Sequence, residues 1–177
     1  MKGLISAIFL VIFGITTLPS LAADSSSVQV GFSPEGSART LVLGAIASAH
    51  SSIRMMAYSF TAMDIMDALV AAKKRGVDIK IVIDERGNRN NISKKAINYV
   101  VSNGIALRLD SDFAIQHDKV IIIDGRTVET GSYNFTKAAE NKNSENAIVI
   151  WNMEPLAKSY LKHWEDRWNR GVNYVEQ

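Results

Sequence analysis

The sequence predicts an α/β domain in which a mixed β-sheet is flanked by helices on both faces. Three β-then-α units follow one another between residues 28 and 103, an order that favours an α/β sandwich with parallel neighbouring strands. After these units, four strand-like segments are joined by short connections and lead to a final helix. The 177 residues show no internal repeat and no low-complexity tract. We therefore expect a single domain over residues 23–177.

Cap and turn residues mark where the expected elements begin and end. Thr61 is a good N-cap for the second helix and Ser93 for the third, while Gly76 and Gly104 end these helices. A polar loop follows the third strand at 85–91. The expected strands span residues 28–32, 53–60, 77–83, 106–109, 118–123, 126–131 and 147–151. The expected helices span residues 37–49, 61–75, 93–103 and 155–170.

Composition narrows the chemistry that is open to the chain. Hydrophobic residues make up 47% of the sequence and charged residues 21%, so a packed core is expected. There is no cysteine, which excludes disulfides and thiolate metal sites. The histidines His50, His117 and His163 are too few to favour a histidine-rich zinc site within one chain. A net charge of +2 is too small to bind nucleic acid by bulk charge, so phosphate affinity must come from local clustering.

The N-terminus has the features of a secretory signal peptide, which we place at residues 1–22. A short positive segment precedes an apolar stretch, and small residues follow the proline that ends the stretch. We expect cleavage after Ala22, with cleavage after Ala23 as the second choice. The apolar run of about 15 residues is shorter than the roughly 20 that cross a bilayer, which favours a signal peptide over an uncleaved anchor. The expected product is periplasmic or extracellular, with no stable membrane association.

One hairpin carries the residues that indicate chemistry. Asp124-Gly125 lies between two β-rich runs and predicts a two-residue type I′ turn. The resulting register places Lys119 opposite Thr130. It also places His117 opposite Ser132, and paired residues share a face of the sheet.

Four polar side chains are therefore expected at one end of this ribbon. His117, Lys119 and Ser132 share a face because side chains alternate along a strand, and Asn134 joins them if the strand persists. An imidazole, an ammonium, a hydroxyl and an amide together suit a tetrahedral oxyanion. His117 and Lys119 alone would fit a solvated strand edge equally well, and the two further groups make that interpretation less favoured.

Asp124 belongs to the other end of the hairpin. It lies in the turn, roughly 16 Å from Lys119 along an extended strand, and has the opposite parity. We expect it to shape the turn or to make a structural contact, and not to touch a reacting phosphate.

The same segment resembles the HKD signature of the phospholipase D superfamily. The spacing His117-x-Lys119-x4-Asp124-x6-Gly131-Ser132-x-Asn134 matches that signature throughout, with Asp124 and Gly131 as structural members. The similarity continues at Tyr58-Ser59-Phe60-Thr61 and at Asn143-Ser144-Glu145-Asn146. A single motif, a short chain and a leader are most similar to small bacterial Nuc-type endonucleases. The resemblance implies a phospholipase D-like α-β-α sandwich.

The resemblance also implies a mechanism for phosphodiester hydrolysis. His117 would attack phosphorus and form a phosphohistidine, Lys119, Ser132 and Asn134 would bind the phosphate, and Glu145 would orient His117. Single-motif relatives dimerise, so a homodimer with a shared active site is expected, in which a second His117 acts as general acid. The scheme requires no metal and no other cofactor.

The expected substrate is the backbone of DNA, with RNA left open. The candidate backbone contacts are Arg86, Arg89, Lys94 and Lys137, although a solvated surface explains these cations equally well. No base-reading motif is present, which indicates cleavage without sequence specificity. The alternative substrate is a phospholipid diester. The third interpretation is a catalytically inactive dimer that binds nucleic acid or has a structural role, and the intact site residues argue against it.

A metal site is the lowest-ranked alternative. Its ligands would be Asp110, Asp112, His117 and Asp118. Asp118 points away from His117 by strand parity, which disfavours such a site.

Overall fold

Eight strands and five α-helices make up residues 25–176, the part of the chain that this computed structural model describes. The strands are β1 (Ser27–Ser33), β2 (Ser52–Ala57), β3 (Asp78–Asp84), β4 (Ala106–Asp110), β5 (Lys119–Ile123), β6 (Thr127–Gly131), β7 (Glu145–Trp151) and β8 (Val172–Asn173). The helices are α1 (Ser37–Ala47), α2 (Met63–Lys74), α3 (Asn91–Ser102), α4 (Lys137–Asn141) and α5 (Glu154–Arg170), with a 3₁₀ turn η1 (Arg86–Asn88). The predicted signal peptide, residues 1–22, and the cleavage positions after Ala22 and Ala23 lie outside the described residues.

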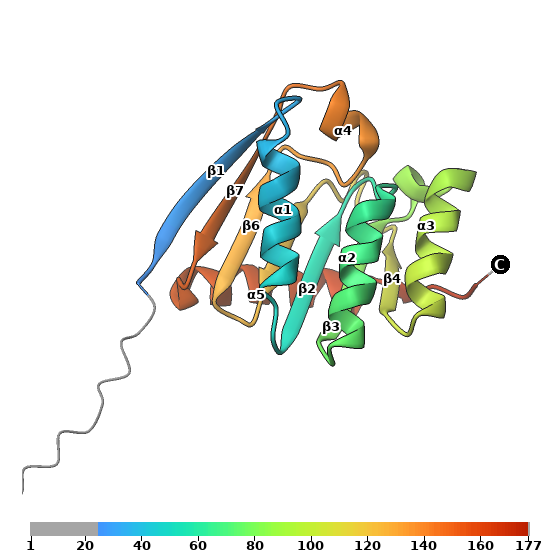
Figure 1. The fold of residues 1–177 in the computed structure, drawn as a ribbon. Coiled ribbons are helices and arrows are strands. Elements are labelled where there is room, and N and C mark those ends of the chain that lie inside the picture. The colour runs from blue at the N-terminus through green and yellow to red at the C-terminus, as the bar shows by residue number, and fades with distance from the viewer. Residues whose placement is uncertain (1–24, 177) are drawn as a thin grey trace, which may run out of the picture.

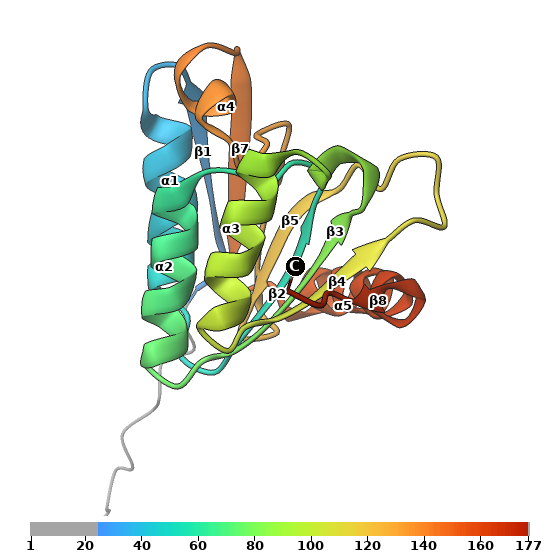
Figure 2. The same cartoon turned by 90° about the vertical axis from the view of Figure 1, so that its right-hand side faces the viewer.

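All eight strands belong to one mixed sheet, in the order β1-β7-β6-β5-β2-β3-β4-β8. β2, β3 and β4 are parallel neighbours because a helix connects each to the next, whereas β5, β6, β7 and β1 pair antiparallel. α1, α2 and α3 cover one face of the sheet and α5 crosses the other (Figure 1, Figure 2). The predicted mixed sheet with helices on both faces is therefore confirmed.

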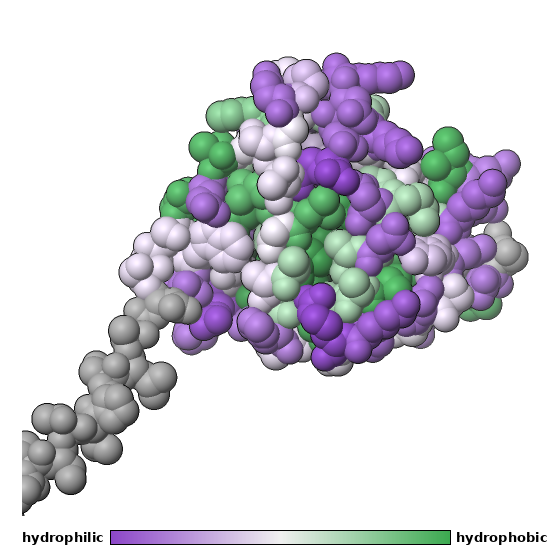
Figure 3. Space-filling model, viewed as in Figure 1, coloured by the Kyte–Doolittle hydropathy of each residue, from purple (hydrophilic) through white to green (hydrophobic). Residues whose placement is uncertain are grey.

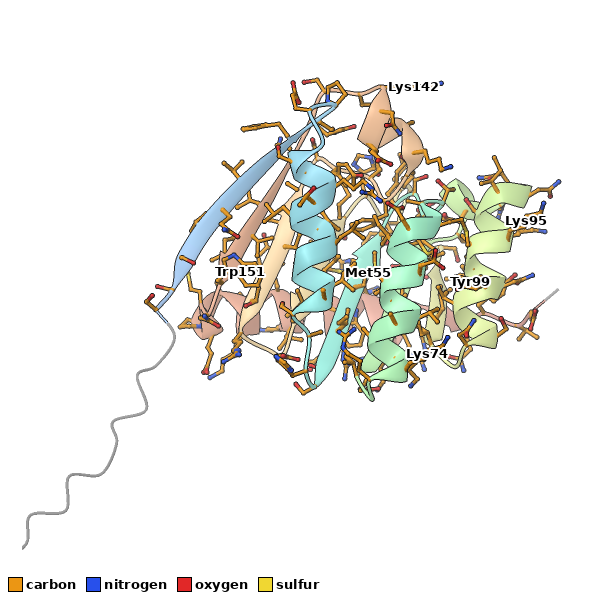
Figure 4. All side chains as sticks on the ribbon, viewed as in Figure 1. Met55, Lys74, Lys95, Tyr99, Lys142 and Trp151 are labelled. Atoms are coloured by element: carbon orange, nitrogen blue, oxygen red, sulfur yellow. The ribbon has the colours of Figure 1, made fainter. Side chains whose placement is uncertain are left out.

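The central strands are apolar on both faces because helices cover both. Met55 and Ile81 pair with each other and face α1 and α2, whereas Met56 and Val82 face α5. Trp164 of α5 closes the second layer, and its indole N–H donates to the carbonyl oxygen of Met55 at 3.1 Å. Figure 4 shows Met55 at the centre of the sheet. Within residues 25–176, none of the helices has the length and apolar character that crossing a membrane requires.

Both predicted N-caps are wrong, whereas Gly76 and Gly104 follow the ends of α2 and α3 as predicted. α2 has Ala62 at its cap position, without a side-chain hydrogen bond, and the N–H of Thr61 instead donates to the carbonyl of Phe135 at 2.9 Å. α3 begins before Ser93, because Asn90 is its cap and accepts a hydrogen bond of 2.9 Å from the Ser93 N–H. At α2, a tertiary hydrogen bond to Phe135 takes the place of the expected cap. At α3, the side chain of Asn90 accepts the capping hydrogen bond in place of Ser93.

Three short elements were not predicted. η1 lies within the expected polar loop at 85–91, α4 lies between β6 and β7, and β8 pairs with β4 after α5. β7 also begins at Glu145, two residues before the predicted strand. Such short elements depend on tertiary partners that local sequence patterns do not reveal.

The β5–β6 hairpin has the predicted turn but a different register. Asp124 and Gly125 have φ angles of 52° and 66°, as a type I′ turn requires, and the N–H of Arg126 donates to the carbonyl of Ile123 at 3.1 Å. However, Ile123 pairs with Thr127 and not with Arg126. The carbonyl of Arg126 instead accepts a hydrogen bond of 2.7 Å from the backbone just before α5, so Arg126 leaves the ladder.

The predicted register is therefore wrong by one residue. Thr130 pairs with Val120, whereas the sequence placed it opposite Lys119. A shift of one residue exchanges the two faces of a strand, so pairing alone would turn Ser132 away from His117.

Asp124 attaches the hairpin turn to the segment before β2. Its carboxylate accepts hydrogen bonds of 2.8–3.0 Å from the N–H groups of His50, Ser51 and Ser52 and from the hydroxyl of Ser51. Burial raises the pKa of Asp124, but these hydrogen bonds outweigh burial and hold the pKa below its usual value. The described partners of Asp124 are thus structural.

Glu129 is a buried acid in the middle of β6. It is 0% exposed, lies between Ile121 and Val149 on the paired strands, and has no hydrogen-bond partner for either carboxyl oxygen among residues 25–176. Burial raises the pKa of Glu129 to about 8. The carboxyl group is therefore neutral at lower pH and becomes a cost to folding as the pH approaches that value.

We predict that Asp124→Asn lowers the free energy of unfolding at pH 7 by about 1–3 kcal/mol, because asparagine tolerates the positive φ but weakens four hydrogen bonds to a charged acceptor. A depressed folded-state pKa stabilises the fold above the unfolded-state pKa, and this contribution is lost as the pH falls through the folded-state value. Urea denaturation should therefore show a difference between the two proteins that shrinks as the pH falls below the ordinary aspartate pKa of about 3.9. A difference independent of pH would contradict this account of Asp124.

We predict that the stability gain of Glu129→Gln over the wild type grows between about pH 5 and pH 8. Below the unfolded pKa of 4.5 both states hold the proton; above it the unfolded chain loses the proton first, because the folded-state pKa is about 8. Wild-type stability then falls by up to about 1.4 kcal/mol per pH unit. Thermal melts of both proteins at several pH values measure this difference, and a constant difference would show that Glu129 does not titrate in this range.

Candidate active site

A cavity of about 370 Å³ lies at the edge of the sheet where β5 and β7 begin and β6 ends. Its lining residues are His117, Lys119, Gly131, Ser132, Asn134 and Glu145. The structure thus brings together all five residues that the sequence selects for chemistry. Their individual roles remain predictions.

His117 precedes β5, and its side chain is exposed to solvent. The imidazole lies beside the ring of Tyr58, which follows β2, with 4.6 Å between ring centroids and a tilt of 59°. This contact restricts the orientation of the imidazole while the residue stays accessible to a substrate. The sequence includes Tyr58 in the family resemblance but gives no reason to place it against His117.

Lys119 is buried beneath His117 with only 6% of its surface exposed. Its Nζ donates to the carbonyl oxygen of His117 at 2.7 Å and lies 5.4 Å from the centroid of the Tyr58 ring. Burial lowers the pKa of Lys119, and the carboxylates of Asp118 and Glu145 raise it by less. An ammonium group with this little solvent attracts a phosphate more strongly than an exposed one.

A bulge in the strand that continues β6 keeps Ser132 in the site despite the register shift. The N–H groups of Ser132 and Tyr133 both donate to the carbonyl oxygen of Asn146, at 3.1 and 3.2 Å, so two residues oppose one. The bulge adds one residue to this strand, whereas Arg126 at the other end of β6 does not pair with β5. The two irregularities therefore compensate each other. Gly131 permits the close approach, since a Cβ there would lie 2.3 Å from the Asn146 oxygen.

Asn134 contributes an amide whose hydrogen bonds are incomplete. Its Oδ1 is buried and has no partner within the described part of the chain. A buried polar atom without a partner is costly, and a bound group can remove that cost. A phosphate oxygen also only accepts, so the Nδ2 group of this amide is the part that could bind a phosphate, and Oδ1 would need a donor from the rest of the substrate.

Glu145 is joined to Ser132 and not to His117 in the single chain. Its Oε2 accepts from the hydroxyl of Ser132 at 2.6 Å, and its Oε1 accepts from the amide of Asn143 at 2.9 Å. The contact with Ser132 orients a hydroxyl of the site. The predicted role of Glu145 in orienting His117 stays a prediction.

Asp84 and Asn88 hold the loops that carry His117 and Tyr58. Asp84 ends β3 and accepts a hydrogen bond of 2.9 Å from the N–H of Gln116, and Asn88 donates to the carbonyl of Tyr58 at 2.6 Å. Each of the two residues is 2% exposed. Nothing in the sequence assigns them to the site, although a carboxylate that directly follows a buried strand is a usable signal.

The four predicted backbone contacts lie in or next to η1, α3 and α4. Arg86 donates to two carbonyl groups of the loop before β5, at 3.3 and 3.0 Å, and Arg89 forms an ion pair of 2.8 Å with Glu85. These two arginines thus have partners within the chain. Lys94 lies in α3, and Lys137 begins α4 and lines a second cavity beside the first.

The residues of the alternative metal site do not form a cluster. Asp118 turns toward α5, where it lies 3.4 Å from the Nε2 of His163, and Asp112 pairs with Arg170 at 3.4 Å. Across residues 25–176, no three or more histidines, cysteines and acidic residues gather in a way that could hold a metal ion. The candidate ligands of that site are Asp110, Asp112, His117 and Asp118.

A larger cavity, of about 880 Å³, lies between β1, β7 and α1. Trp151, labelled in Figure 4, is part of its lining. The described lining includes the carboxylate of Glu35 and neither a histidine nor a lysine. It therefore lacks the groups that attack or neutralise a phosphate.

Comparisons of sequence and structure place the chain among known proteins. Residues 42–168 match the family described as cardiolipin synthase, PLD-like domain. A phospholipase D of Rickettsia conorii is 38% identical over 142 residues, which cover 80% of this chain and 70% of the relative. A mitochondrial cardiolipin hydrolase of Danio rerio is 33% identical over 122 residues, covering 67% of this chain and 53% of the relative.

Comparison with solved structures indicates the same family. The phospholipase D family member Nuc from Salmonella typhimurium is 73% identical, with a TM-score of 0.84 over 85% of this chain and 99% of that chain. NucT from Helicobacter pylori, at 23% identity, shares the fold with a TM-score of 0.72 over 85% of this chain and 100% of that chain. The chain therefore belongs to the phospholipase D superfamily, as a single-motif phosphodiester hydrolase of the Nuc type.

Proposed function

We propose that this chain is a secreted, metal-independent endonuclease that cleaves DNA, with RNA as a second nucleic-acid substrate, without sequence specificity. The observation that carries the proposal is the convergence of His117, Lys119 and Asn134 on one cavity at the sheet edge. Family membership supplies the reaction class, and these side chains supply a nucleophile, a positive charge and an amide.

The first chemical step is attack on phosphorus by a ring nitrogen of neutral His117. An N–P bond forms while the bond from phosphorus to the leaving oxygen breaks. Lys119, held by the His117 carbonyl at 2.7 Å, offsets the negative charge that makes phosphodiesters resist attack. The leaving alkoxide takes a proton from a second imidazole, which must be protonated at that moment.

The second step regenerates the enzyme. The second imidazole, now neutral, accepts a proton from water as the water oxygen attacks phosphorus and the N–P bond breaks. Neither His50 nor His163 lines the cavity, and His163 pairs with Asp118 toward α5. We therefore assign the second imidazole to the partner subunit's His117.

An uncovered apolar strip beside the cavity supports such a dimer. α5 packs mainly across β2 to β6, whereas on the same face of β1 three apolar side chains are more than half exposed. They are Val28, Val30 and Phe32, with exposures of 61%, 54% and 52%. Phe32 pairs with Asn146, the residue after Glu145, so the strip ends at the cavity. A second copy that covered this strip would bring the two cavities together about a two-fold axis.

Phospholipid hydrolysis is the second candidate function. The names of the rickettsial and fish relatives, phospholipase D and mitochondrial cardiolipin hydrolase, favour it. A phospholipid diester would meet the same nucleophile and the same ammonium, so the chemistry does not separate the two substrates. We favour nucleic acid because hydrophilic side chains gather at the end of the molecule where α4 lies (Figure 3).

We also propose that the protein acts outside the cytoplasm, in the periplasm or beyond. The support is the leader-like composition of residues 1–22. Removal of those residues leaves a net charge of +1, so attraction to nucleic acid depends on local cations such as Lys137.

We predict that the mature protein nicks supercoiled plasmid in excess EDTA and that His117→Ala lowers this rate by roughly 10³-fold or more, because the nucleophile is lost. His50→Ala is the matched control, since His50 is exposed and lies outside the cavity. Phospholipid vesicles are assayed beside the plasmid. Lipid hydrolysis without nicking would reject the nuclease, and nicking abolished by EDTA would reject metal independence.

We predict that Phe32→Glu converts the dimer to a monomer in sedimentation equilibrium and abolishes nicking, because a charge on the apolar strip opposes its burial. Val175→Glu is the control, since Val175 is 76% exposed and lies near the C-terminus. When wild type and His117→Ala are co-expressed, a shared site makes activity fall as the square of the wild-type fraction. A linear fall, or an active Phe32→Glu monomer, would contradict the shared site.

A further inference from the structure

A second cavity, of about 480 Å³, adjoins the candidate catalytic cavity. Asn134 lines both, so the two cavities are neighbours on either side of one residue. Three separate segments form the second cavity: the loop after β2, the first turn of α3, and the segment from Asn134 to Asn143. None of the roles assigned above requires this space.

The lining of the second cavity combines flat apolar surface with polar groups. Tyr58 supplies an aromatic ring, and Ile92 supplies an aliphatic side chain that is 67% exposed. Thr61, Thr136 and Asn143 supply hydroxyl and amide groups. A nucleobase has apolar faces and polar edges and is joined to a polar sugar, so a nucleoside matches this lining better than an acyl chain does.

Positive charge lies at the rim of the second cavity. Lys137 lines it and is exposed. Lys142, which directly follows α4, and Lys95 of α3 lie toward the same end of the molecule (Figure 4). A strand of nucleic acid that leaves the catalytic cavity past Asn134 would carry its next phosphate toward these cations.

The positions of Tyr58 and Asn134 link the two cavities. The ring of Tyr58 contacts His117 at 4.6 Å between centroids, and Tyr58 also lines the second cavity. A group bound there would therefore touch the residue that packs against the nucleophile. The volume of about 480 Å³ falls within the roughly 300–1,000 Å³ typical of sites for small organic ligands.

We propose that the second cavity is a subsite for the nucleoside next to the scissile phosphate, with its base against Tyr58 and Ile92 and its next phosphate near Lys137. The proposal rests on the proposed nuclease function and adds a site to it. It makes the rate depend on a nucleoside beside the phosphate, independently of which base that nucleoside carries.

Three chromogenic phosphodiesters test the subsite. Two carry one nucleoside, thymidine 3′-(4-nitrophenyl phosphate) and thymidine 5′-(4-nitrophenyl phosphate), and the third, methyl 4-nitrophenyl phosphate, carries none. The wild type should prefer at least one thymidine substrate over the methyl substrate by about tenfold in kcat/KM. Ile92→Ala should reduce that preference and leave the methyl substrate unchanged. Lys137→Ala should reduce the further gain in kcat/KM that a phosphate on the other hydroxyl of the thymidine gives, because Lys137 would contact that phosphate.

Matched controls come from the same chain. Val172→Ala removes an apolar side chain that is 71% exposed on β8, and Lys74→Ala removes an exposed lysine at the opposite end of the molecule (Figure 4). Both controls should keep the full preference for the thymidine substrate. Ile92 and Lys137 are exposed, so circular dichroism should show both variants folded.

The outcomes separate the subsite from the nuclease function. If wild type nicks plasmid but shows no preference for thymidine, or if the variants lower all three rates equally, the subsite is rejected and the nuclease stands. If wild type does not nick plasmid, the nuclease function itself is rejected. If Ile92→Ala slows hydrolysis of diheptanoyl phosphatidylcholine and not of the thymidine substrates, the cavity takes a lipid and the proposal is overturned.

Discussion

One carbonyl oxygen, that of Asn146, decides where the site residues point. It accepts hydrogen bonds from two consecutive N–H groups, those of Ser132 and Tyr133, and this bulge returns Ser132 to the cavity. The contact requires a residue without a Cβ at position 131, since a Cβ would lie 2.3 Å from the oxygen. The glycine of the HKD segment is therefore a packing requirement of the sheet that serves the site indirectly.

The site is preorganised by buried polar contacts. Asp84 and Asn88 fix the loops before His117 and after β2, and the His117 carbonyl fixes the ammonium of Lys119. Of the site residues, Lys119 is buried, and its low exposure to solvent strengthens the attraction of its ammonium group for a phosphate. The imidazole of His117 is exposed, as the proposed shared site requires, because the partner subunit's His117 would have to reach the same phosphate.

The sequence predicted the fold class and the set of residues at the site, but not the way in which they are brought together. Continuous apolar runs and the HKD spacing are local patterns, and they identified the central strands and the residues from His117 to Asn134. The register failed because Arg126 bonds to the backbone before α5, a tertiary contact with no local signature. The strand departs from ideal pairing twice, at Arg126 and at Ser132, and the two shifts compensate each other. The predicted set of residues is therefore correct although the predicted register is wrong.

Asp124 and His117 lie at opposite ends of the β5–β6 hairpin, and a mutation at one can be compensated in a way that a mutation at the other cannot. The carboxylate of Asp124 contributes stability through four hydrogen bonds at the turn, and stability is additive over distant sites. A second-site change anywhere in the core can therefore restore what is lost at Asp124. In the proposed mechanism His117 supplies a reacting atom, and no gain in stability elsewhere would replace it. In a random mutant library, suppressors should be recovered for Asp124 and none for His117, although one short motif contains both residues.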